Sequence, residues 1–262
     1  MNAHNESAAR TVEPVTASFG AVAPYYDNLM SHVPYRYWLD YVEALWKRHC
    51  VDVKSVVDLA CGTGTMTLLL AERGYKVIGV DLSEGMLTAA LEKSVAFPDL
   101  LYMQQDASSL DLPQKPWDAI VCLFDSMNYI LDSRALQRAF VSARENLKPG
   151  GALIFDVNTR YALEEGMFNQ SCSRRAEPLH YRWRSRFDPC TDVCTVSMVF
   201  HFDDGSGQRR TFRETHKQRA YPKDALVEWL HEAGFLEVAV YDAYTFDPAY
   251  KRSDRLFFVA VC

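Results

Sequence analysis

The fold of this chain is decided by residues 56–67, which have the sequence VVDLACGTGTMT. Two valines lead into Asp58, and such β-branched residues are typical of a parallel strand that is buried on both faces. Gly62 and Gly64 follow, and because neither has a Cβ they permit a sharp turn and the close approach of a ligand. After Gly64 the apolar residues recur at helical spacing. The stretch therefore predicts a strand, a glycine turn and a helix whose N-terminus faces a ligand.

A second strand and its terminal acid narrow the choice of ligand. Residues 76–80 are predicted to form this strand, and Asp81 ends it 17 positions beyond Gly64. That distance is near the roughly 20-residue spacing at which a carboxylate meets ribose hydroxyls in nucleotide-binding folds. The working hypothesis is therefore a ligand that contains adenosine.

The charge of the glycine loop separates two such ligands. The dinucleotide fingerprint requires a third glycine, whereas this chain has Thr67 in that place. Asp58 would repel a pyrophosphate and attract a cation. S-adenosylmethionine (SAM) carries an ammonium, a sulfonium and no phosphate. The loop therefore favours SAM, and an NAD-linked oxidoreductase is the less favoured alternative.

The run from Asp58 to Gly64 matches the first motif of the class I SAM-dependent methyltransferases, and the sequence resembles that family over nearly its whole length after Phe19. The resemblance implies that the glycine loop wraps the methionine part of SAM and that Asp81 holds the ribose. The adenine is expected to meet the carboxylate of Asp106 and the amide of the next residue. The expected product is S-adenosylhomocysteine. The expected cofactor residues are Asp58, Ala60, Gly62, Gly64, Asp81, Leu82, Asp106, Ala107, Cys122 and Tyr26.

The same resemblance implies the order of the strands. We expect a Rossmann-like, seven-stranded mixed α/β sheet in the order 3-2-1-4-5-7-6, with strand 7 antiparallel and helices on its flanks. Residues 18–165 and 222–262 are expected to form this SAM-binding domain. The strands after residue 81 are predicted at residues 100–104, 117–122, 152–158, 237–241 and 255–261.

Residues 166–221 are predicted to form an insertion after the fifth strand. Apolar and polar residues alternate in residues 180–187, 193–202 and 210–220, which is typical of β-strands. We therefore expect a small three-stranded antiparallel β-sheet, and the resemblance implies that it covers the active site. The arginines that alternate with aromatic residues in its first strand are interpreted as a solvated outer face.

The composition of the chain argues against several other functions. The chain has 262 residues and a net charge of −6, which argues against binding of duplex DNA or bulk RNA. No apolar run approaches the roughly 20 residues of a membrane span. The polar start, residues 1–17, is predicted to be a flexible tail without a signal sequence, so the expected location is the cytoplasm. The seven cysteines are scattered, and no metal site is predicted.

The acceptor side is predicted from polar residues near the ends of the later strands, because ligands of open α/β sheets bind beyond those ends. Asp125, Tyr129 and His216 are the candidate catalytic residues, since each is able to take a proton from an acceptor. For Tyr25 and Tyr26 the sequence leaves two roles open, a lid over the cofactor and packing in the core, and of the pair Tyr25 is the one favoured as a lid residue. The candidate substrate contacts are Tyr25, Asn128, Asn158, Arg219 and Tyr221.

Further motifs, including FDSMNY at residues 124–129 and QRAY at residues 218–221, look like one bacterial group of class I methyltransferases of unsettled substrate. The sequence is similar, more distantly, to amino-sugar N-methyltransferases and to glycine N-methyltransferase. The amino-sugar enzymes tend to have a histidine where Tyr129 stands, so their substrate class does not carry over directly.

We therefore expect in-line transfer of the sulfonium methyl group to a nucleophilic nitrogen or oxygen of a small polar acceptor. A tRNA or protein acceptor is the first alternative, and a SAM-binding module without catalysis is another. A homodimer is an assembly that the sequence leaves open.

Overall fold

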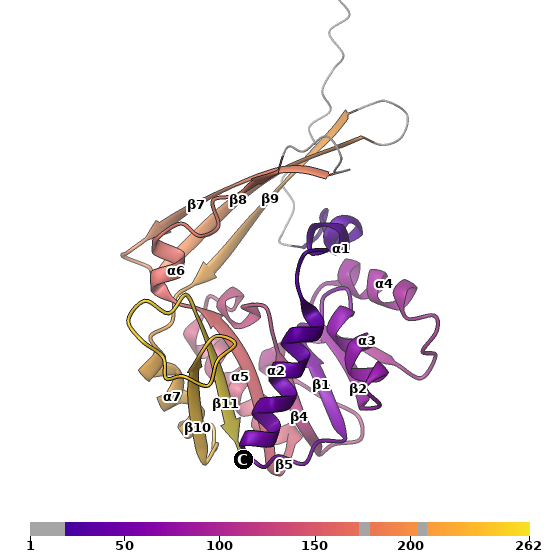
Figure 1. Ribbon diagram of the computed structural model, residues 1–262, viewed down its shortest axis with the longest axis vertical. Helices are drawn as coiled ribbons and strands as arrows, with labels where there is room; N and C mark the ends of the chain where they lie inside the picture. Colours follow the sequence, from indigo (N-terminus) through magenta and orange to yellow (C-terminus); the bar gives the residue numbers. More distant parts are fainter. Residues whose placement is uncertain (1–18, 173–178, 204–208) are drawn as a thin grey trace, which may run out of the picture.

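A computed structural model describes residues 19–172, 179–203 and 209–262, and its largest element is a seven-stranded sheet (Figure 1). The strands lie in the order β10-β11-β5-β4-β1-β2-β3. Strand β11 runs antiparallel to both of its neighbours, whereas the pairs among β1 to β5 are parallel. The expected order 3-2-1-4-5-7-6 is therefore confirmed. The strands are β1 Ser55–Leu59, β2 Lys76–Asp81, β3 Leu101–Gln104, β4 Trp117–Cys122, β5 Leu147–Asn158, β10 Glu237–Asp242 and β11 Arg255–Val261.

Helices cover both faces of this sheet because successive side chains of a strand point to opposite faces. On one face, α5 (Ser133–Asn146) and α7 (Lys223–Glu232) contribute to one apolar core. On the other face, α2 (Tyr35–Arg48) and α3 (Thr65–Glu72) contribute to a second core. The central strands are therefore apolar on both sides, which leaves their carboxyl ends as the place where polar side chains can meet a ligand.

A second sheet of four antiparallel strands lies beyond one end of the first, in the order β6-β7-β8-β9 (Figure 1). The expected three strands are thus corrected to four. The additional strand has two residues and pairs with β7 at Tyr181 and Arg182. Two residues are too few for alternation to be visible in the sequence. The strands are β6 Ser171–Cys172, β7 Leu179–Asp188, β8 Val193–Asp203 and β9 Arg209–Arg219.

The apolar face of the second sheet forms a third core. Phe200 and Phe212 on β8 and β9 pack there with Val22, with Met86 of α4 (Glu84–Lys93) and with the helix α6 (Arg160–Glu164). This contact joins the second sheet to the segment that precedes α2.

That N-terminal segment, residues 19–30, is not a single continuous helix. It contains η1 (Ala23–Tyr25) and α1 (Tyr26–Leu29). Phe19 has a left-handed φ of +64°, which a right-handed helix excludes. The predicted tail, residues 1–17, lies outside the described residues.

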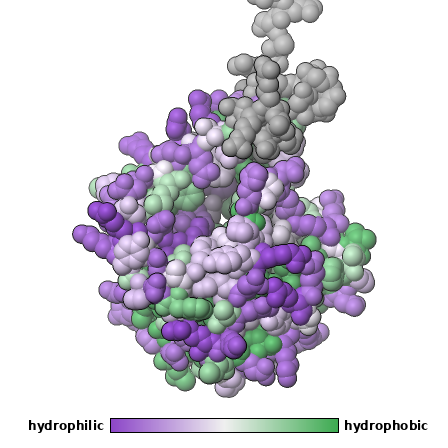
Figure 2. Space-filling model, viewed as in Figure 1, coloured by the Kyte–Doolittle hydropathy of each residue, from purple (hydrophilic) through white to green (hydrophobic). Residues whose placement is uncertain are grey.

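The surface in the view of Figure 2 is largely hydrophilic, with smaller hydrophobic areas between the polar ones. In the part of the chain that the structure describes, no helix combines the length and the apolar character needed to cross a membrane.

Candidate active site

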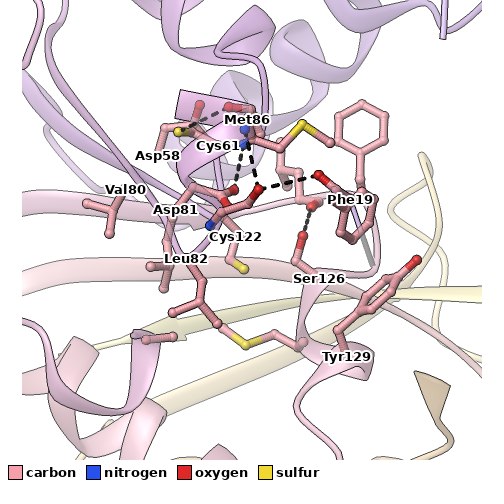
Figure 3. A pocket seen from close by; sticks show the side chains of 18 of the residues that line it. Phe19, Asp58, Cys61, Val80, Asp81, Leu82, Met86, Cys122, Ser126 and Tyr129 are labelled. Atoms are coloured by element: carbon pink, nitrogen blue, oxygen red, sulfur yellow. Dashed lines mark hydrogen bonds between the residues drawn. The ribbon is translucent and has the colours of Figure 1, made fainter. Parts of the chain in front are cut away.

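A cavity of about 900 Å³ lies where the carboxyl ends of β1, β2 and β4 meet the N-terminal segment and β9 (Figure 3). Its size is typical of pockets that enclose a small-molecule ligand. Nine of the ten residues predicted to bind the cofactor line this cavity. They are Asp58, Ala60, Gly62, Asp81, Leu82, Asp106, Ala107, Cys122 and Tyr26.

The loop between β1 and α3 turns through three left-handed residues, Ala60 (φ +57°), Gly62 (φ +55°) and Gly64 (φ +74°). A Cβ added to Gly62 would meet no atom within 4 Å, so a ligand can approach the backbone there. A Cβ added to Gly64 would lie 2.6 Å from Tyr102 Oη. Gly64 is not among the residues that line the cavity, and its contact with the cofactor stays a prediction. Gly64 permits the left-handed turn and the close packing of Tyr102 against the loop.

Asp81, at the end of β2, ties the glycine loop to the next connection. Its Oδ2 accepts the backbone N–H of Gly62 at 2.8 Å, and its Oδ1 accepts that of Ser83 at 2.8 Å. Burial raises the pKa of the Asp81 carboxyl, while the backbone hydrogen bonds act in the opposite direction. The side chain nevertheless reaches the cavity, where it is available to polar groups of a ligand.

Asp58 lies deeper and is 3% exposed. Its Oδ2 accepts the hydroxyl of Thr67 at 2.6 Å. Burial raises the pKa of Asp58 to about 7, and the nearby charge of Asp81 adds to the effect. Neither carboxylate forms an ion pair with another described residue. One buried and one partly buried acid in the same cavity therefore fit a ligand that brings its own positive charge.

Another part of the cavity wall is formed by the residues that follow β2 and β3. Leu82 is 66% exposed although it is apolar, and it lies beside the cavity as a surface for a flat, apolar group. Asp106 accepts the backbone N–H of Ser108 at 2.7 Å, so it caps η2 (Ala107–Ser109) while facing the cavity. This part thus combines an apolar surface with a carboxylate and backbone amides.

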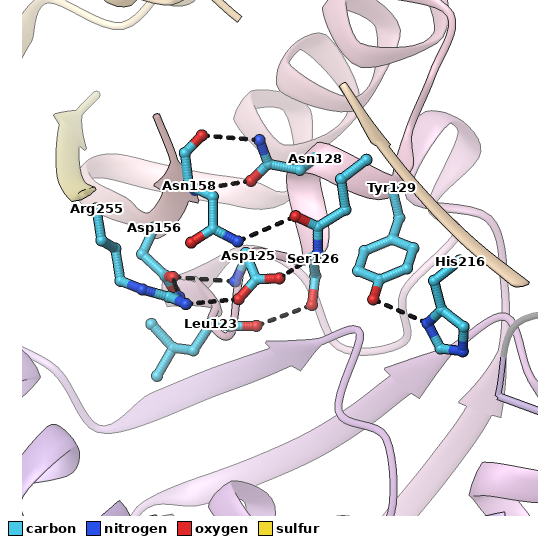
Figure 4. A network of polar contacts seen from close by, with 10 residues as sticks. Leu123, Asp125, Ser126, Asn128, Tyr129, Asp156, Asn158, His216 and Arg255 are labelled. Atoms are coloured by element: carbon cyan, nitrogen blue, oxygen red, sulfur yellow. Dashed lines mark hydrogen bonds and ion pairs between the residues drawn. The ribbon is translucent and has the colours of Figure 1, made fainter. Parts of the chain in front are cut away.

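Of the three predicted catalytic residues, Tyr129 alone lines the cavity. It lies in η3 (Ser126–Tyr129), and its Oη is 3.0 Å from Nδ1 of His216 on β9. His216 is buried behind the tyrosine. Asp125 is directed away from the cavity, toward Arg255, whose Nη2 lies 2.7 Å from Asp125 Oδ1 (Figure 4). Asp125 is not among the residues that line the cavity, and its action on the acceptor stays a prediction without support from this geometry.

Two predicted substrate contacts, Asn128 and Asn158, also lie in this buried network behind the wall (Figure 4). Asn128 Nδ2 donates to the carbonyl oxygens of Asn158 at 3.1 Å and Arg219 at 2.8 Å, and Asn128 Oδ1 accepts the N–H of Asn158 at 2.9 Å. Asn158 Nδ2 donates to Gln218 on β9 at 3.0 Å. These side chains join η3, β5 and β9 because buried amides must be paired. Neither side chain is among the residues that line the cavity, and their contact with the substrate stays a prediction.

The three other predicted substrate contacts lie outside the cavity wall as well. Arg219 and Tyr221 donate hydrogen bonds to main-chain carbonyls of the loop that follows η3. Tyr25 packs against phenylalanine rings of the second sheet, with centroids 4.7 and 5.7 Å away. Of the two roles left open for the tyrosine pair, Tyr25 has the packing role, whereas Tyr26 lines the cavity.

Several residues of the wall were missed by the sequence analysis. Phe19, Tyr35, Phe124, Thr215 and Lys217 line the cavity. The alternation in β9 was a usable signal for the last two, since they occupy the positions between the buried Glu214, His216 and Gln218. Nothing in the local sequence marks Phe19, Tyr35 and Phe124 as cavity residues, because aromatic residues at such positions are equally typical of the apolar core.

The sheet order, the left-handed glycine turn and the acid at the end of β2 define a Rossmann-like α/β protein with a nucleoside-binding type of cavity. Comparison with known proteins gives the family. A model of a methyltransferase domain matches residues 56–151. The Bacillus subtilis (strain 168) protein "Putative methyltransferase YqeM" is 35% identical over 239 residues, which are 91% of this chain and 94% of that protein. The chain belongs to the family of SAM-dependent methyltransferases.

Solved structures agree with this assignment. A SAM-dependent methyltransferase from Clostridium acetobutylicum ATCC 824 matches with a TM-score of 0.79 and 29% identity, over 92% of this chain and 97% of that one. The sugar N-methyltransferase KedS8 from Streptoalloteichus sp ATCC 53650 matches with a TM-score of 0.78 and 22% identity, over 99% of both chains. Mouse glycine N-methyltransferase is 31% identical over 160 residues, which are 56% of this chain and 53% of that protein. The expected family and its cofactor, SAM, are confirmed.

Proposed function

We propose that the chain transfers the methyl group of SAM to a nucleophilic nitrogen or oxygen of a small polar acceptor that enters the cavity beside Tyr129. The observation that carries the proposal is the pairing of two cation-free carboxylates, the buried Asp58 and the partly buried Asp81, with an open glycine backbone at Gly62. Within the described residues these acids have no positive partner, and SAM supplies two positive charges and no phosphate.

The cavity wall suggests where each part of SAM is held. We assign the methionine end to the glycine loop and Asp58, because a buried carboxylate stabilises an ammonium. Asp81 is positioned to accept hydrogen bonds from ribose hydroxyls. Asp106, the Ala107 amide and Leu82 offer an acceptor, a donor and an apolar surface for adenine. Cys122 and Tyr26 complete the wall around the methyl group.

The chemistry requires positioning more than covalent assistance. When bound, SAM supplies a methyl group that its sulfonium has already activated. The acceptor's lone pair forms the new bond to the methyl carbon, and the electron pair of the broken C–S bond stays on sulfur. The protein aligns the acceptor, excludes water with the N-terminal segment and takes up a proton. Tyr129 is the residue of the wall that we place at the accepting atom.

The names of two relatives support a small acceptor. Glycine N-methyltransferase of the mouse is similar over about half of this chain. A Streptomyces venezuelae enzyme named for the N,N-dimethylation of a dTDP-linked amino sugar is 33% identical over 105 residues, 40% of this chain. Both names describe methylation of an amine on a small molecule, which is the reaction that we propose.

Two measurements test this function. Calorimetry with SAM, S-adenosylhomocysteine and NAD is expected to show binding of the first two and none of the third. A panel of amino sugars, amino acids and other small amines, screened by release of S-adenosylhomocysteine, is then expected to identify the acceptor. Binding of NAD without binding of SAM would refute the proposed donor site.

One observation favours an RNA acceptor as a second candidate. Arg182, Arg184 and Arg186 on β7 and Arg213 and Lys217 on β9 are exposed on one face of the second sheet. In register, Arg182 and Arg213 lie opposite each other across β8, as do Arg186 and Lys217. None of the five forms an ion pair with a described carboxylate, and Lys217 connects this face to the cavity.

A basic face of this kind, on a chain with a net charge of −6, is suited to the phosphates of RNA. Fluorescence anisotropy with a labelled single-stranded RNA and with bulk tRNA tests this candidate. Binding should weaken steeply with salt and at least tenfold in the double variant Arg184→Glu/Arg213→Glu. The matched control Arg134→Glu/Arg138→Glu, at two exposed positions of α5, makes the same change of net charge elsewhere. Absence of binding at low salt would refute the RNA acceptor.

A further inference from the structure

We infer that Glu214, His216 and Tyr129 form a proton relay at the acceptor end of the cavity, in which Glu214 is a positioning residue that selects the tautomer of His216. The inference rests on the proposed methyl transfer. It adds Glu214, which the sequence does not single out, and it assigns a direction to each hydrogen bond of the relay.

The three side chains form a continuous line of contacts. Tyr129 Oη lies 3.0 Å from His216 Nδ1, and His216 Nε2 lies 2.8 Å from Glu214 Oε2 (Figure 4 shows the first contact). Glu214 and His216 are 1% and 2% exposed, whereas Tyr129 lines the cavity. A ligand in the cavity can therefore contact Tyr129, while Glu214 and His216 are shielded from solvent.

Backbone donors set the direction of these hydrogen bonds. Glu214 Oε1 accepts the N–H of Val22 at 2.8 Å, and Oε2 accepts the N–H of Phe19 at 3.1 Å. Both oxygens are thus acceptors already, which favours the ionised carboxylate, and a carboxylate can only accept from His216 Nε2. A neutral His216 then carries its hydrogen on Nε2 and presents a bare Nδ1. Tyr129 donates its O–H to that nitrogen.

This direction makes the tyrosine oxygen an acceptor toward the cavity. As an N–H or O–H of the acceptor molecule gives its proton to Tyr129 Oη, the tyrosine passes its own proton to His216 Nδ1. One proton leaves the acceptor and one arrives on the imidazole, so Tyr129 ends neutral and the positive charge rests beside Glu214. Burial raises the pKa of Tyr129, so its phenolate is not the resting base, and the histidine supplies the basicity instead.

Glu214 also holds the N-terminal segment that closes the cavity, by accepting hydrogen bonds from its backbone. The two backbone groups that it accepts belong to Phe19 and Val22. The Phe19 ring lines the cavity and lies 5.1 Å from the Tyr129 ring and 4.7 Å from the His216 ring, measured between centroids. The carboxylate that orients the histidine therefore also holds the wall that keeps water from it.

The tautomer of His216 tests the inference without knowledge of the acceptor. Long-range ¹H–¹⁵N correlation spectra of ¹⁵N-labelled protein are recorded at pH 8, alone and with S-adenosylhomocysteine, and the His216→Gln variant identifies the signals. The expected result is a neutral ring protonated on Nε2. A ring protonated on Nδ1, or on both nitrogens, would overturn the inference because Tyr129 could not then donate to it.

A kinetic comparison separates the relay from a structural role. With an acceptor found in the screen, Tyr129→Phe is expected to lower kcat about 10²-fold and to leave the affinity for SAM unchanged. Glu214→Gln should also lower kcat, whereas Glu228→Gln, exposed on α7, is the matched control. Wild-type turnover in Glu214→Gln would exclude the relay. Failure of the wild type to bind SAM would instead refute the proposed function, and the tautomer would still be measurable.

Discussion

Asp81 Oδ2 accepts a hydrogen bond of 2.8 Å from the backbone N–H of Gly62, so the acid that ends β2 is joined to the turn that follows β1. The two strands are parallel neighbours, and their carboxyl ends therefore lie at the same edge of the sheet. This relationship places a carboxylate and an open backbone side by side in the donor end of the cavity. The first two predictions concern this pair.

Gly62→Arg is expected to abolish measurable binding of SAM. The position has a φ of +55° and open space where a side chain would begin, so an arginine would enter the cavity and add positive charge to it. Gly74→Arg is the matched control, because Gly74 also has a positive φ (+88°) and open space, but lies outside the cavity wall. Calorimetry on both variants measures the difference. Equal affinities would remove Gly62 from the donor site.

Asp81→Ala is expected to weaken SAM binding by about 10- to 100-fold, the usual worth of a hydrogen bond to a charged group. The variant also removes the acceptor for two backbone N–H groups, so its melting temperature is measured alongside the dissociation constant. Asp52→Ala, at a highly exposed acid on the connection before β1, is the control. A dissociation constant equal to that of the wild type would contradict the assignment.

The affinity for SAM is expected to rise with pH because of Asp58. Burial raises the pKa of this carboxyl to about 7, and the ligand's ammonium is stabilised by the ionised form. If SAM binds that form alone, the affinity should increase by about 20-fold between pH 5.5 and 7.5. Asp58→Asn should flatten this dependence. A steep dependence that survives in the variant would assign the titration to another group.

Asp58 should affect the stability of the ligand-free protein in the opposite direction: its contribution should fall with rising pH, whereas the affinity for SAM should rise. A folded pKa above the unfolded value of about 3.9 means that the folded state holds the proton more tightly. The contribution of Asp58 to stability is therefore complete below about pH 4 and is lost as the pH rises toward 7. Urea unfolding of wild type and Asp58→Asn across this range should show the variant gaining relative stability at the higher pH.

Gly79→Ala is expected to destabilise the protein by about 1–3 kcal/mol through overpacking. A Cβ at this position of β2 would lie 2.6 Å from Tyr102 Cδ1 and 3.0 Å from Cys61 Sγ. Gly85→Ala is a matched control on α4, where the nearest atom to an added Cβ is 3.7 Å away. The control should stabilise the helix by about 0.5–1 kcal/mol. Urea denaturation of both variants compares the two sites, and an equal effect would refute the packing argument.

Arg255→Met is expected to destabilise the protein by about 3–5 kcal/mol, because it leaves Asp125 and Asp156 buried without their cation. Burial already raises the pKa of Asp156, and loss of the arginine should raise it further. The deficit should therefore be larger at pH 8 than at pH 5, where the Asp156 carboxyl can take up a proton. Arg252→Met, at an exposed position, is the control. A deficit that does not change with pH would contradict this explanation.

The donor end of the site was predictable because its signals are local. The glycine turn, Asp58 and Asp81 lie within 24 residues, and the connection from one strand to the next determines where they meet. The strand order was an expectation implied by the resemblance to class I methyltransferases, and the structure has that order. Nine predicted cofactor residues consequently share one cavity.

The acceptor end was not predictable in the same way. Asn128, Asn158 and Asp125 follow strands of the main sheet, as ligand-binding residues often do, yet their side chains are taken up by partners on β9 and β11. Those partners are 60 to 130 residues away in the chain. A polar residue near a strand end has the same local pattern whether it meets a ligand or a distant amide.

The amino-acid sequence by itself determined the class of fold, the donor pocket and its preference for a positively charged nucleoside, since hydrophobic periodicity and a short glycine motif act over neighbouring residues. Only the tertiary structure decided which polar groups reach the cavity. It turned Asp125 toward Arg255, set Tyr129 against His216 and brought Glu214 to the backbone of Phe19 and Val22. Such contacts depend on how the second sheet packs against the first. A buried polar group must be hydrogen-bonded, and the packing determines which distant residue is its partner.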